Sequence, residues 1–190
     1  MNPDLLLDRL VAFEHRVRRV YLTLSGRPDF PPHVRAFWNY MAEDERQHAA
    51  ILERSPALLD VMDSPPETSE NALAILEAKV VAAEAAVGQS DLRGDEAFRL
   101  TLMLEDAELN SLDEAWFQGF RPTRGSLLQA MLPEEEVHIR RVVDAVQAFS
   151  TDEVLQRQAA ALWSTYERQR QTYSTTNVPG KTQTVTTPAQ

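Results

Sequence analysis

The sequence contains no cysteine, and this absence excludes several classes of protein. A chain without thiols cannot form a disulfide scaffold, a thiolate zinc site or an iron–sulfur centre, and it has no cysteine nucleophile. Glycine is scarce, with 6 among 190 residues, and the sequence has no glycine-rich phosphate-binding loop and no Gly-x-Ser-x-Gly motif. Long apolar runs are also missing, because no segment approaches the ~18–20 residues that a membrane span needs.

Basic residues are outnumbered by acidic ones. The 19 Lys and Arg residues against 29 Asp and Glu residues give a formal charge of -10. Such a chain repels the phosphates of nucleic acids and of anionic membranes, so we expect no nucleic-acid and no membrane partner. The N-terminal segment mixes charged with apolar residues and lacks the basic start of a signal peptide. These absences together lead us to expect a cytoplasmic protein.

The residues that are abundant favour helices. Ala, Leu, Glu, Arg and Gln are strong helix formers, and apolar residues recur every three or four positions. No segment shows a convincing strand pattern. The predicted helices span about 3–25, 32–54, 69–88, 94–118, 126–149 and 152–171, the last with Thr151 as its N-cap.

Two pairs of predicted helices resemble each other. The first pair is joined around Gly26-Arg27-Pro28, and a similar Gly-Phe-Arg-Pro segment joins the second pair. Two similar hairpins and a long connection predict an all-α four-helix bundle with an extra helix in the crossover. We therefore divide the chain into a bundle at 1–150, a C-terminal amphipathic helix at 151–173 and a flexible tail at 174–190, which has few large apolar residues.

Acidic residues and histidines occupy positions where the helical period predicts burial. On four of the predicted helices, an apolar stripe at i, i+3 and i+4 spacing includes such groups. Buried carboxylates cost several kcal/mol each, and they repel one another. The stripes contain no Lys or Arg to compensate, so a metal centre is the simplest explanation. The residues concerned are Glu14, Glu45, His48, Glu105, Glu108, Glu135 and His138.

Two segments, residues 45–48 and 135–138, share the pattern Glu-x-x-His. Side chains three positions apart project from the same face of a helix and can reach one metal centre. The helix before each segment adds a glutamate, with Glu14 31 positions before Glu45 and Glu105 30 positions before Glu135. Oxygen and imidazole donors suit iron or manganese, and zinc is an alternative. Two divalent ions would offset four of the five negative charges.

This arrangement resembles the rubrerythrin branch of the ferritin-like di-iron carboxylate proteins, over about residues 4–149. The resemblance implies a ferritin-like bundle that holds two iron ions. By this resemblance, Glu45 and Glu135 bridge the two ions, and Glu14 is a terminal ligand of the first ion.

The resemblance also implies roles for the remaining candidates. Glu105 and His138 would bind the second ion, while Glu108 and His48 would exchange on the first ion as its redox state changes. Tyr21 resembles a tyrosine that lies beside the site in this family, and we take it as the candidate catalytic side chain.

The implied function is that of a non-haem di-iron oxidoreductase, which reduces hydrogen peroxide or oxidises Fe(II) with peroxide or oxygen. Rubrerythrins proper carry a cysteine-containing rubredoxin domain, which this sequence lacks, so electrons must come from Fe(II) or from an external donor. The alternatives are an iron storage or cargo protein in a larger assembly and a non-enzymatic ferritin-like interaction module. The resemblance implies a homodimer, and residues 152–173 are the candidate interface, because their apolar stripe needs cover.

Two features leave alternatives open. Pro133 lies two residues before Glu135, where it removes a helical hydrogen bond and should either kink its helix or mark the start of the regular part. Glu77 and Glu84 border the apolar stripe of the crossover helix, where they are either solvated charges or accessory metal contacts.

Overall fold

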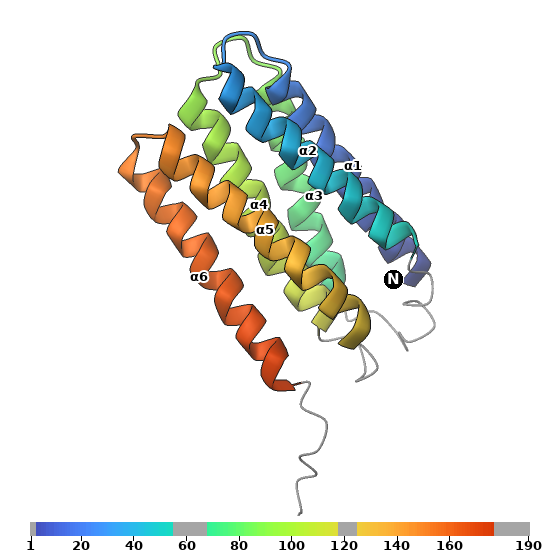
Figure 1. Cartoon of the computed structure of the whole chain (residues 1–190). Helices are drawn as coiled ribbons and strands as arrows, with labels where there is room; N and C mark the ends of the chain where they lie inside the picture. The colour runs from blue at the N-terminus through green and yellow to red at the C-terminus, as the bar shows by residue number, and fades with distance from the viewer. Residues whose placement is uncertain (1–2, 55–67, 118–124, 177–190) are drawn as a thin grey trace, which may run out of the picture.

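The computed structural model describes residues 3–54, 68–117 and 125–176, and these ranges are mainly helical (Figure 1). They contain no strand, so the all-α prediction is confirmed. None of the helices in these ranges combines the length and the apolar character that a membrane span requires. The helices are α1 (Pro3–Ser25), α2 (Pro32–Glu53), α3 (Thr68–Val87), α4 (Gly94–Phe117), α5 (Gly125–Phe149) and α6 (Glu153–Thr176).

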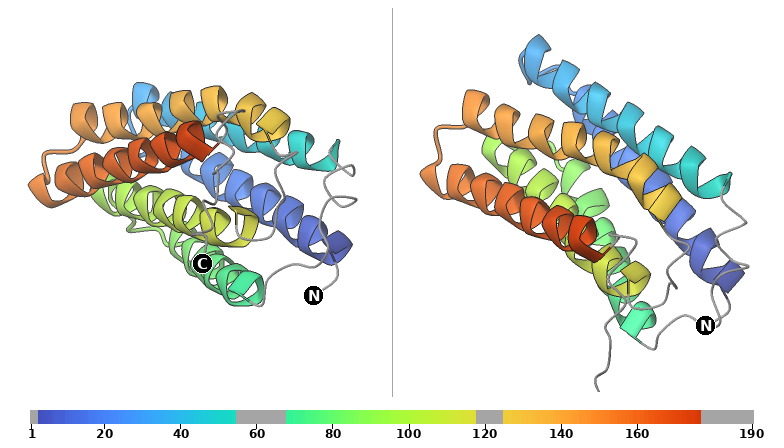
Figure 2. Two further views of the ribbon diagram at one scale, coloured as in Figure 1. Left: turned by 90° about the horizontal axis from the view of Figure 1, so that it is seen from below. Right: turned by 60° about the horizontal axis from the view of Figure 1, so that its bottom comes forward.

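The helices form three antiparallel hairpins that lie side by side, namely α1–α2, α3–α4 and α5–α6 (Figures 1 and 2). The turns within all three hairpins lie at the same end of the bundle, and the N-terminus lies at the opposite end. Contacts of α1 with α3 and of α4 with α6 join the hairpins, while α5 also contacts α2 and α4. The predicted bundle is confirmed, with α3 inserted in the connection between α2 and α4.

Local sequence explains where the helices begin and end. Pro32 is the first residue of α2, where a proline loses nothing because its missing N–H would have no helical partner. Gly88 follows the last residue of α3. At the start of α6 the prediction of the cap was wrong: the Asp152 carboxylate, and not Thr151, accepts a hydrogen bond of 2.8 Å from the backbone N–H of Val154.

Helix α6 is longer than the amphipathic pattern predicted. It continues to Thr176, so residues 174–176 of the predicted flexible tail are helical, and the rest of that tail lies outside the described residues. Most of its apolar stripe is buried where α6 packs on α4 and α5, while Val154 at its start is 50% exposed. The stripe therefore does not need a partner chain to cover it, and the homodimer stays a prediction. The buried residues are Leu155, Ala159, Leu162 and Tyr166.

Arg27 in the α1–α2 turn contacts the backbone of the α3–α4 turn. Its guanidinium donates hydrogen bonds to the backbone carbonyls of Gln89 (2.7 Å) and Ser90 (3.1 Å), just after the end of α3, and it pairs with Asp29 at 3.0 Å. Only 12% of the Arg27 side chain is exposed. Free carbonyls at a helix end favour a cation, so this contact fixes the α1–α2 turn against the α3–α4 turn.

Two bidentate ion pairs join α1 to α3. Arg9 donates two hydrogen bonds of 2.8 Å to Glu77, and Arg16 donates hydrogen bonds of 3.0 and 2.6 Å to Glu84. These pairs lower the pKa values of both glutamates, chiefly through the hydrogen bonds from the arginines. Glu77 and Glu84 are thus half-exposed partners of arginines, and neither belongs to a group of candidate metal ligands among the residues that the structure describes.

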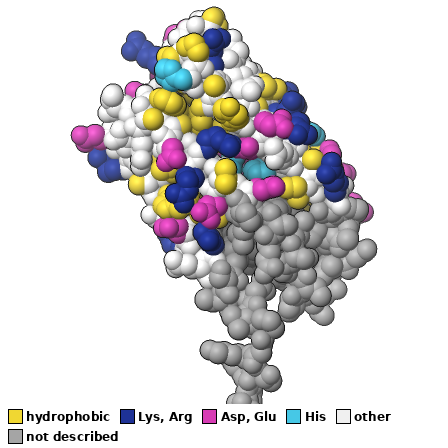
Figure 3. All heavy atoms as spheres, in the orientation of Figure 1, with side chains coloured by type: hydrophobic (Ala, Val, Ile, Leu, Met, Phe, Trp, Pro, Cys, Tyr) yellow, Lys and Arg dark blue, Asp and Glu magenta, His cyan; other side chains and the backbone are white. Residues whose placement is uncertain are grey.

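The surface carries charges of both signs. On the face shown in Figure 3, acidic and basic side chains are interspersed among apolar ones. The formal charge of -10 is therefore not gathered into a single acidic patch on the described part of that face.

Candidate metal centre

The helical period correctly placed most of the candidate ligands inside the bundle. Six of the seven are at most 5% exposed, and they project from α1, α2, α4 and α5. Each lies on the same face of its helix as buried apolar residues, because the spacing of three and four positions matches the helical repeat. The six buried residues are Glu14, Glu45, His48, Glu105, Glu108 and His138.

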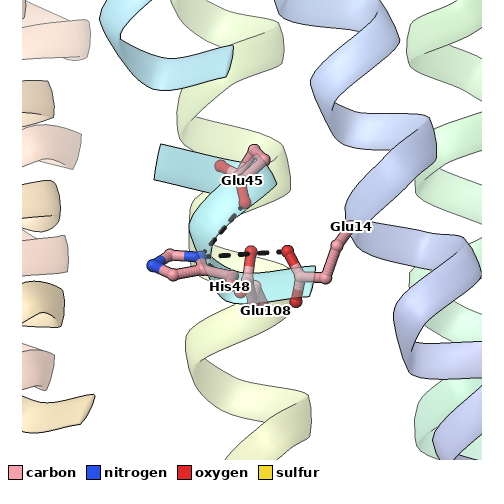
Figure 4. A group of neighbouring side chains, drawn as sticks. All are labelled: Glu14, Glu45, His48 and Glu108. Atoms are coloured by element: carbon pink, nitrogen blue, oxygen red, sulfur yellow. Dashed lines mark hydrogen bonds and ion pairs between the residues drawn. The ribbon is translucent and has the colours of Figure 1, made fainter. Parts of the chain in front are cut away.

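A first group of donors surrounds His48. Its ring and three carboxylates, from α1, α2 and α4, point toward one another, and one donor atom from each lies within 4.8 Å of all the others (Figure 4). The His48 Nδ1 atom is 3.2 Å from Glu45 Oε2, 3.8 Å from Glu14 Oε2 and 4.0 Å from Glu108 Oε1. These distances leave room for an ion between the donors.

A second group surrounds His138 on α5 and has the same spacing of donor atoms. The His138 Nε2 atom is 2.7 Å from Glu105 Oε2 and 3.6 Å from Glu45 Oε1. Glu45 belongs to both groups, with Oε2 facing His48 and Oε1 facing His138, and the two imidazole rings are 5.0 Å apart. The groups are therefore adjacent and share one carboxylate.

The His138 group has two supporting contacts. The hydroxyl of buried Tyr21 donates a hydrogen bond to Glu105 Oε1, so Tyr21 does lie beside the site as the resemblance implied. The Asp44 carboxylate lies 3.2 Å from His138 Nδ1 and forms an ion pair with Arg141. Asp44 is not among the residues predicted from the sequence, although a carboxylate beside the second nitrogen of a metal-binding histidine is a common arrangement.

Glu135 differs from the other candidates. Its side chain is 23% exposed, its Oε2 atom is 4.0 Å from His48 Nε2, and it belongs to neither of the two groups found among the described residues. Pro133 lies within α5, which begins at Gly125, so this proline does not mark the start of the helix. The bridging role that the resemblance implies for Glu135 stays a prediction.

Burial favours the protonated form of three carboxyl groups when no ion is present. Burial raises the pKa of Glu45 to about 8. Burial, followed by the charge of Glu45, raises the pKa of Glu14 well above its usual range. Burial, followed by the charge of Glu14, does the same to the pKa of Glu108. Carboxyls that crowd one another in a dry interior cannot all be ionised without a cation.

In the His138 group, the charge of the histidine offsets the effect of burial on the pKa of a carboxyl. Burial alone would raise the pKa of Glu105, but the charge and hydrogen bond of His138 outweigh burial and lower it. Burial opposes the charge of His138 as well, yet the interactions with Glu105 raise the pKa of His138 well above its usual range. Burial and then the charge of Glu105 raise the pKa of Tyr21, so its hydroxyl keeps its proton. Glu105 and His138 thus form a buried ion pair.

The residues fit a bound cation by two criteria. Within the described residues, three buried carboxylate oxygens, Glu14 Oε2, Glu45 Oε1 and Glu108 Oε2, have no hydrogen-bond partner. Leaving such oxygens buried costs free energy that a cation among them would recover. Carboxylate oxygens with imidazole nitrogens are also a donor set that binds iron, manganese or zinc. This buried group of Glu and His residues could therefore bind a metal ion.

Comparison of the chain with protein-family models, with curated proteins and with solved structures gave no match. The similarity to rubrerythrins therefore stays a hypothesis that rests on the residues themselves and on their geometry.

Proposed function

We propose that this chain is a rubrerythrin-like, ferritin-like di-iron oxidoreductase, which reduces hydrogen peroxide or oxidises Fe(II) with peroxide or oxygen. Electrons would come from Fe(II) or from an external donor, because the sequence has no cysteine with which to hold a rubredoxin iron. One observation carries the proposal: Glu45 is shared by two adjacent buried groups, each of which contains a histidine.

In this proposal, the described residues form two ion positions. Glu14, His48 and Glu108 would hold one ion, and Glu105 with His138 would hold the other. Glu45, whose two oxygens face different histidines, would contact both. When bound, two iron ions supply the two electrons that cleavage of an O–O bond consumes. Manganese or zinc would fit the same donors.

The protein's own side chains prepare the site in three ways. Burial of the donors excludes bulk water, and this strengthens every electrostatic interaction in the site. The hydrogen bond from Tyr21 fixes the orientation of the Glu105 carboxylate and keeps a proton at the Tyr21 hydroxyl, beside the donors. The raised pKa values mean that cation binding must displace protons from Glu14, Glu45 and Glu108.

The proposal is tested by loading metal-free protein with two equivalents of Fe(II) under anaerobic conditions and then mixing it with hydrogen peroxide. We expect near-ultraviolet absorbance to report oxidation of the bound iron much faster than that of free Fe(II). The Glu45→Ala variant, which lacks the shared carboxylate, should lose the fast phase. Wild-type protein that binds Fe(II) but shows no fast oxidation would contradict the enzymatic proposal.

The same preparation separates the alternatives. Light scattering that reveals a particle much larger than a dimer would favour iron storage or a cargo role in an assembly. Protein purified from unsupplemented cells with no bound metal would favour an interaction module. About two metal ions per chain in a dimer-sized particle are the results expected for the di-iron enzyme.

A further inference from the structure

The two Glu-x-x-His segments are each preceded by an acidic residue, but these residues have different surroundings. Asp44 precedes Glu45, and Glu134 precedes Glu135. The Asp44 side chain is only 19% exposed and contacts His138, whereas Glu134 is exposed at the surface of α5. The two acidic residues therefore occupy equivalent positions in the repeat, but of the two only Asp44 is seen to contact a candidate ligand.

We propose that Asp44 is a positioning residue, which holds the His138 ring so that Nε2 faces the ion position formed with Glu45 and Glu105. This inference rests on the proposed metal centre. A carboxylate can only accept a hydrogen bond, so the contact of 3.2 Å requires a hydrogen on His138 Nδ1. The other nitrogen, Nε2, is then the one that binds an ion, and it is the atom that faces Glu105 and Glu45.

Arg141 holds Asp44 in place from the same helix that carries His138. Positions 138 and 141 are three residues apart on α5, so both side chains face α2, which carries Asp44. The Arg141 guanidinium forms the ion pair with Asp44 and also lies over the ring of Tyr40, 5.6 Å from its centroid. Asp44 is therefore contacted from two directions, by Arg141 and by His138.

The effect of Asp44 is expected to be local. His138 belongs to the second group of donors, whereas His48 contacts Glu14, Glu45 and Glu108 through its own Nδ1 atom. Loss of the Asp44 carboxylate should therefore weaken one of the two ion positions and spare the other.

Titration with Co(II) tests this inference without redox chemistry, because visible absorption bands report each bound ion. We expect Asp44→Ala to lower the Co(II) affinity of one position by about 10–100-fold and to leave the other within about threefold of wild type. Asp44→Asn keeps an acceptor oxygen and should show a smaller loss at the same position. Glu134→Ala is the matched control and should titrate like wild type.

A second readout distinguishes ring positioning from general support of the fold. In Co(II)-loaded wild type, the proton on His138 Nδ1 should give a hyperfine-shifted NMR signal that exchanges slowly with solvent. Asp44→Ala should lose this signal or exchange it rapidly, and Glu134→Ala should keep it. Wild-type titration curves for Asp44→Ala, or equal losses at both positions in the two Asp44 variants, would overturn the inference.

The outcomes also separate this inference from the proposed function. Wild-type protein that binds no Co(II) would overturn the metal centre and the role of Asp44 together. Protein that binds Co(II) with the expected dependence on Asp44, but does not oxidise Fe(II) rapidly, would remove only the enzymatic proposal.

Discussion

Around His138 two of the three candidate ligands have a second contact, whereas around His48 the carboxylates mainly face one another. Tyr21 orients Glu105, and Asp44 contacts His138. In the His48 group, the unpartnered oxygens of Glu14 and Glu108 accompany strongly raised pKa values. The His138 group therefore contains its own positive charge, whereas the His48 group has buried carboxyl oxygens that a cation among them would stabilise. A single carboxylate, Glu45, joins these two environments.

The largest effect on metal binding is expected when the residue that both groups share is removed. We expect Glu45→Ala to reduce bound metal from about two ions per chain to well below one, because each ion position loses a carboxylate. Elemental analysis after loading and desalting measures this. Glu43→Ala, which changes an exposed glutamate on the same helix, should keep wild-type metal content. Two retained ions in Glu45→Ala would show that the groups do not share this ligand.

The second prediction concerns the pH dependence of the metal-free protein. Glu14, Glu45 and Glu108 have folded-state pKa values above the ordinary value, so their protonated forms stabilise the fold at low pH. This stabilisation is lost as the pH rises from about 4.5 to about 8, the folded pKa of Glu45. We expect a loss of a few kcal/mol, or a Tm lower by on the order of 10 °C at pH 8 than at pH 5.

The His138 group does not reverse this trend. The raised pKa of His138 also gives stability that is lost as the pH rises, and the lowered pKa of Glu105 matters only below its ordinary value. Calorimetry with and without Zn(II) measures both the trend and its control. Bound metal should raise Tm more at pH 8 than at pH 5, and a metal-free Tm that rises over this range would contradict the assignment.

A pair of conservative substitutions compares the two groups directly. Tyr21→Phe leaves a buried Glu105 oxygen without its donor and should lower the free energy of unfolding of the metal-free protein by about 1–3 kcal/mol. Glu108→Gln replaces a carboxyl that repels its neighbours and should leave stability at pH 8 unchanged or increase it. Urea denaturation measures both. Equal destabilisation by the two changes would remove the distinction between the groups.

The smallest effect is expected outside the centre, at the ion pairs between α1 and α3. A double-mutant cycle of Arg16→Ala and Glu84→Ala should give a coupling free energy of about 0.2–1 kcal/mol, as for other partly exposed pairs. Metal content should stay at the wild-type value in all three variants. A loss of metal in Glu84→Ala would revive the alternative that this residue contacts the ions.

The helices and the six buried candidate donors could be predicted from the sequence, because burial follows the helical period. Glu14 and Glu108, for example, alternate with apolar residues at the spacing that faces the core. Asp44 could not be found in this way, because it is adjacent to Glu45 and lies about 100° away around the helix. Its role depends on His138 and Arg141 of a distant helix, which the period of α2 does not encode.

The helical period also did not predict two further details, the exposure of one carboxylate and the residue that caps α6. It points Glu135 inward, and in the structure that side chain is 23% exposed. Similarly, Thr151 and Asp152 are both good N-caps, and only the backbone geometry at the start of α6 selects Asp152. The exposure of Glu135 and the choice of the N-cap depend on packing between elements and on the geometry of a single turn, which the local pattern does not determine.

The arrangement of the helices as three hairpins has a consequence for assembly of the centre. Glu14 and Glu45 lie on the first hairpin, Glu105 on the second and His138 on the third. The donors of the His48 group come from the first two hairpins, whereas the His138 group needs a residue from each of the three. An ion held by the His138 group would therefore bind only after the third hairpin has docked, whereas the donors of the His48 group can meet once the first two hairpins have packed together.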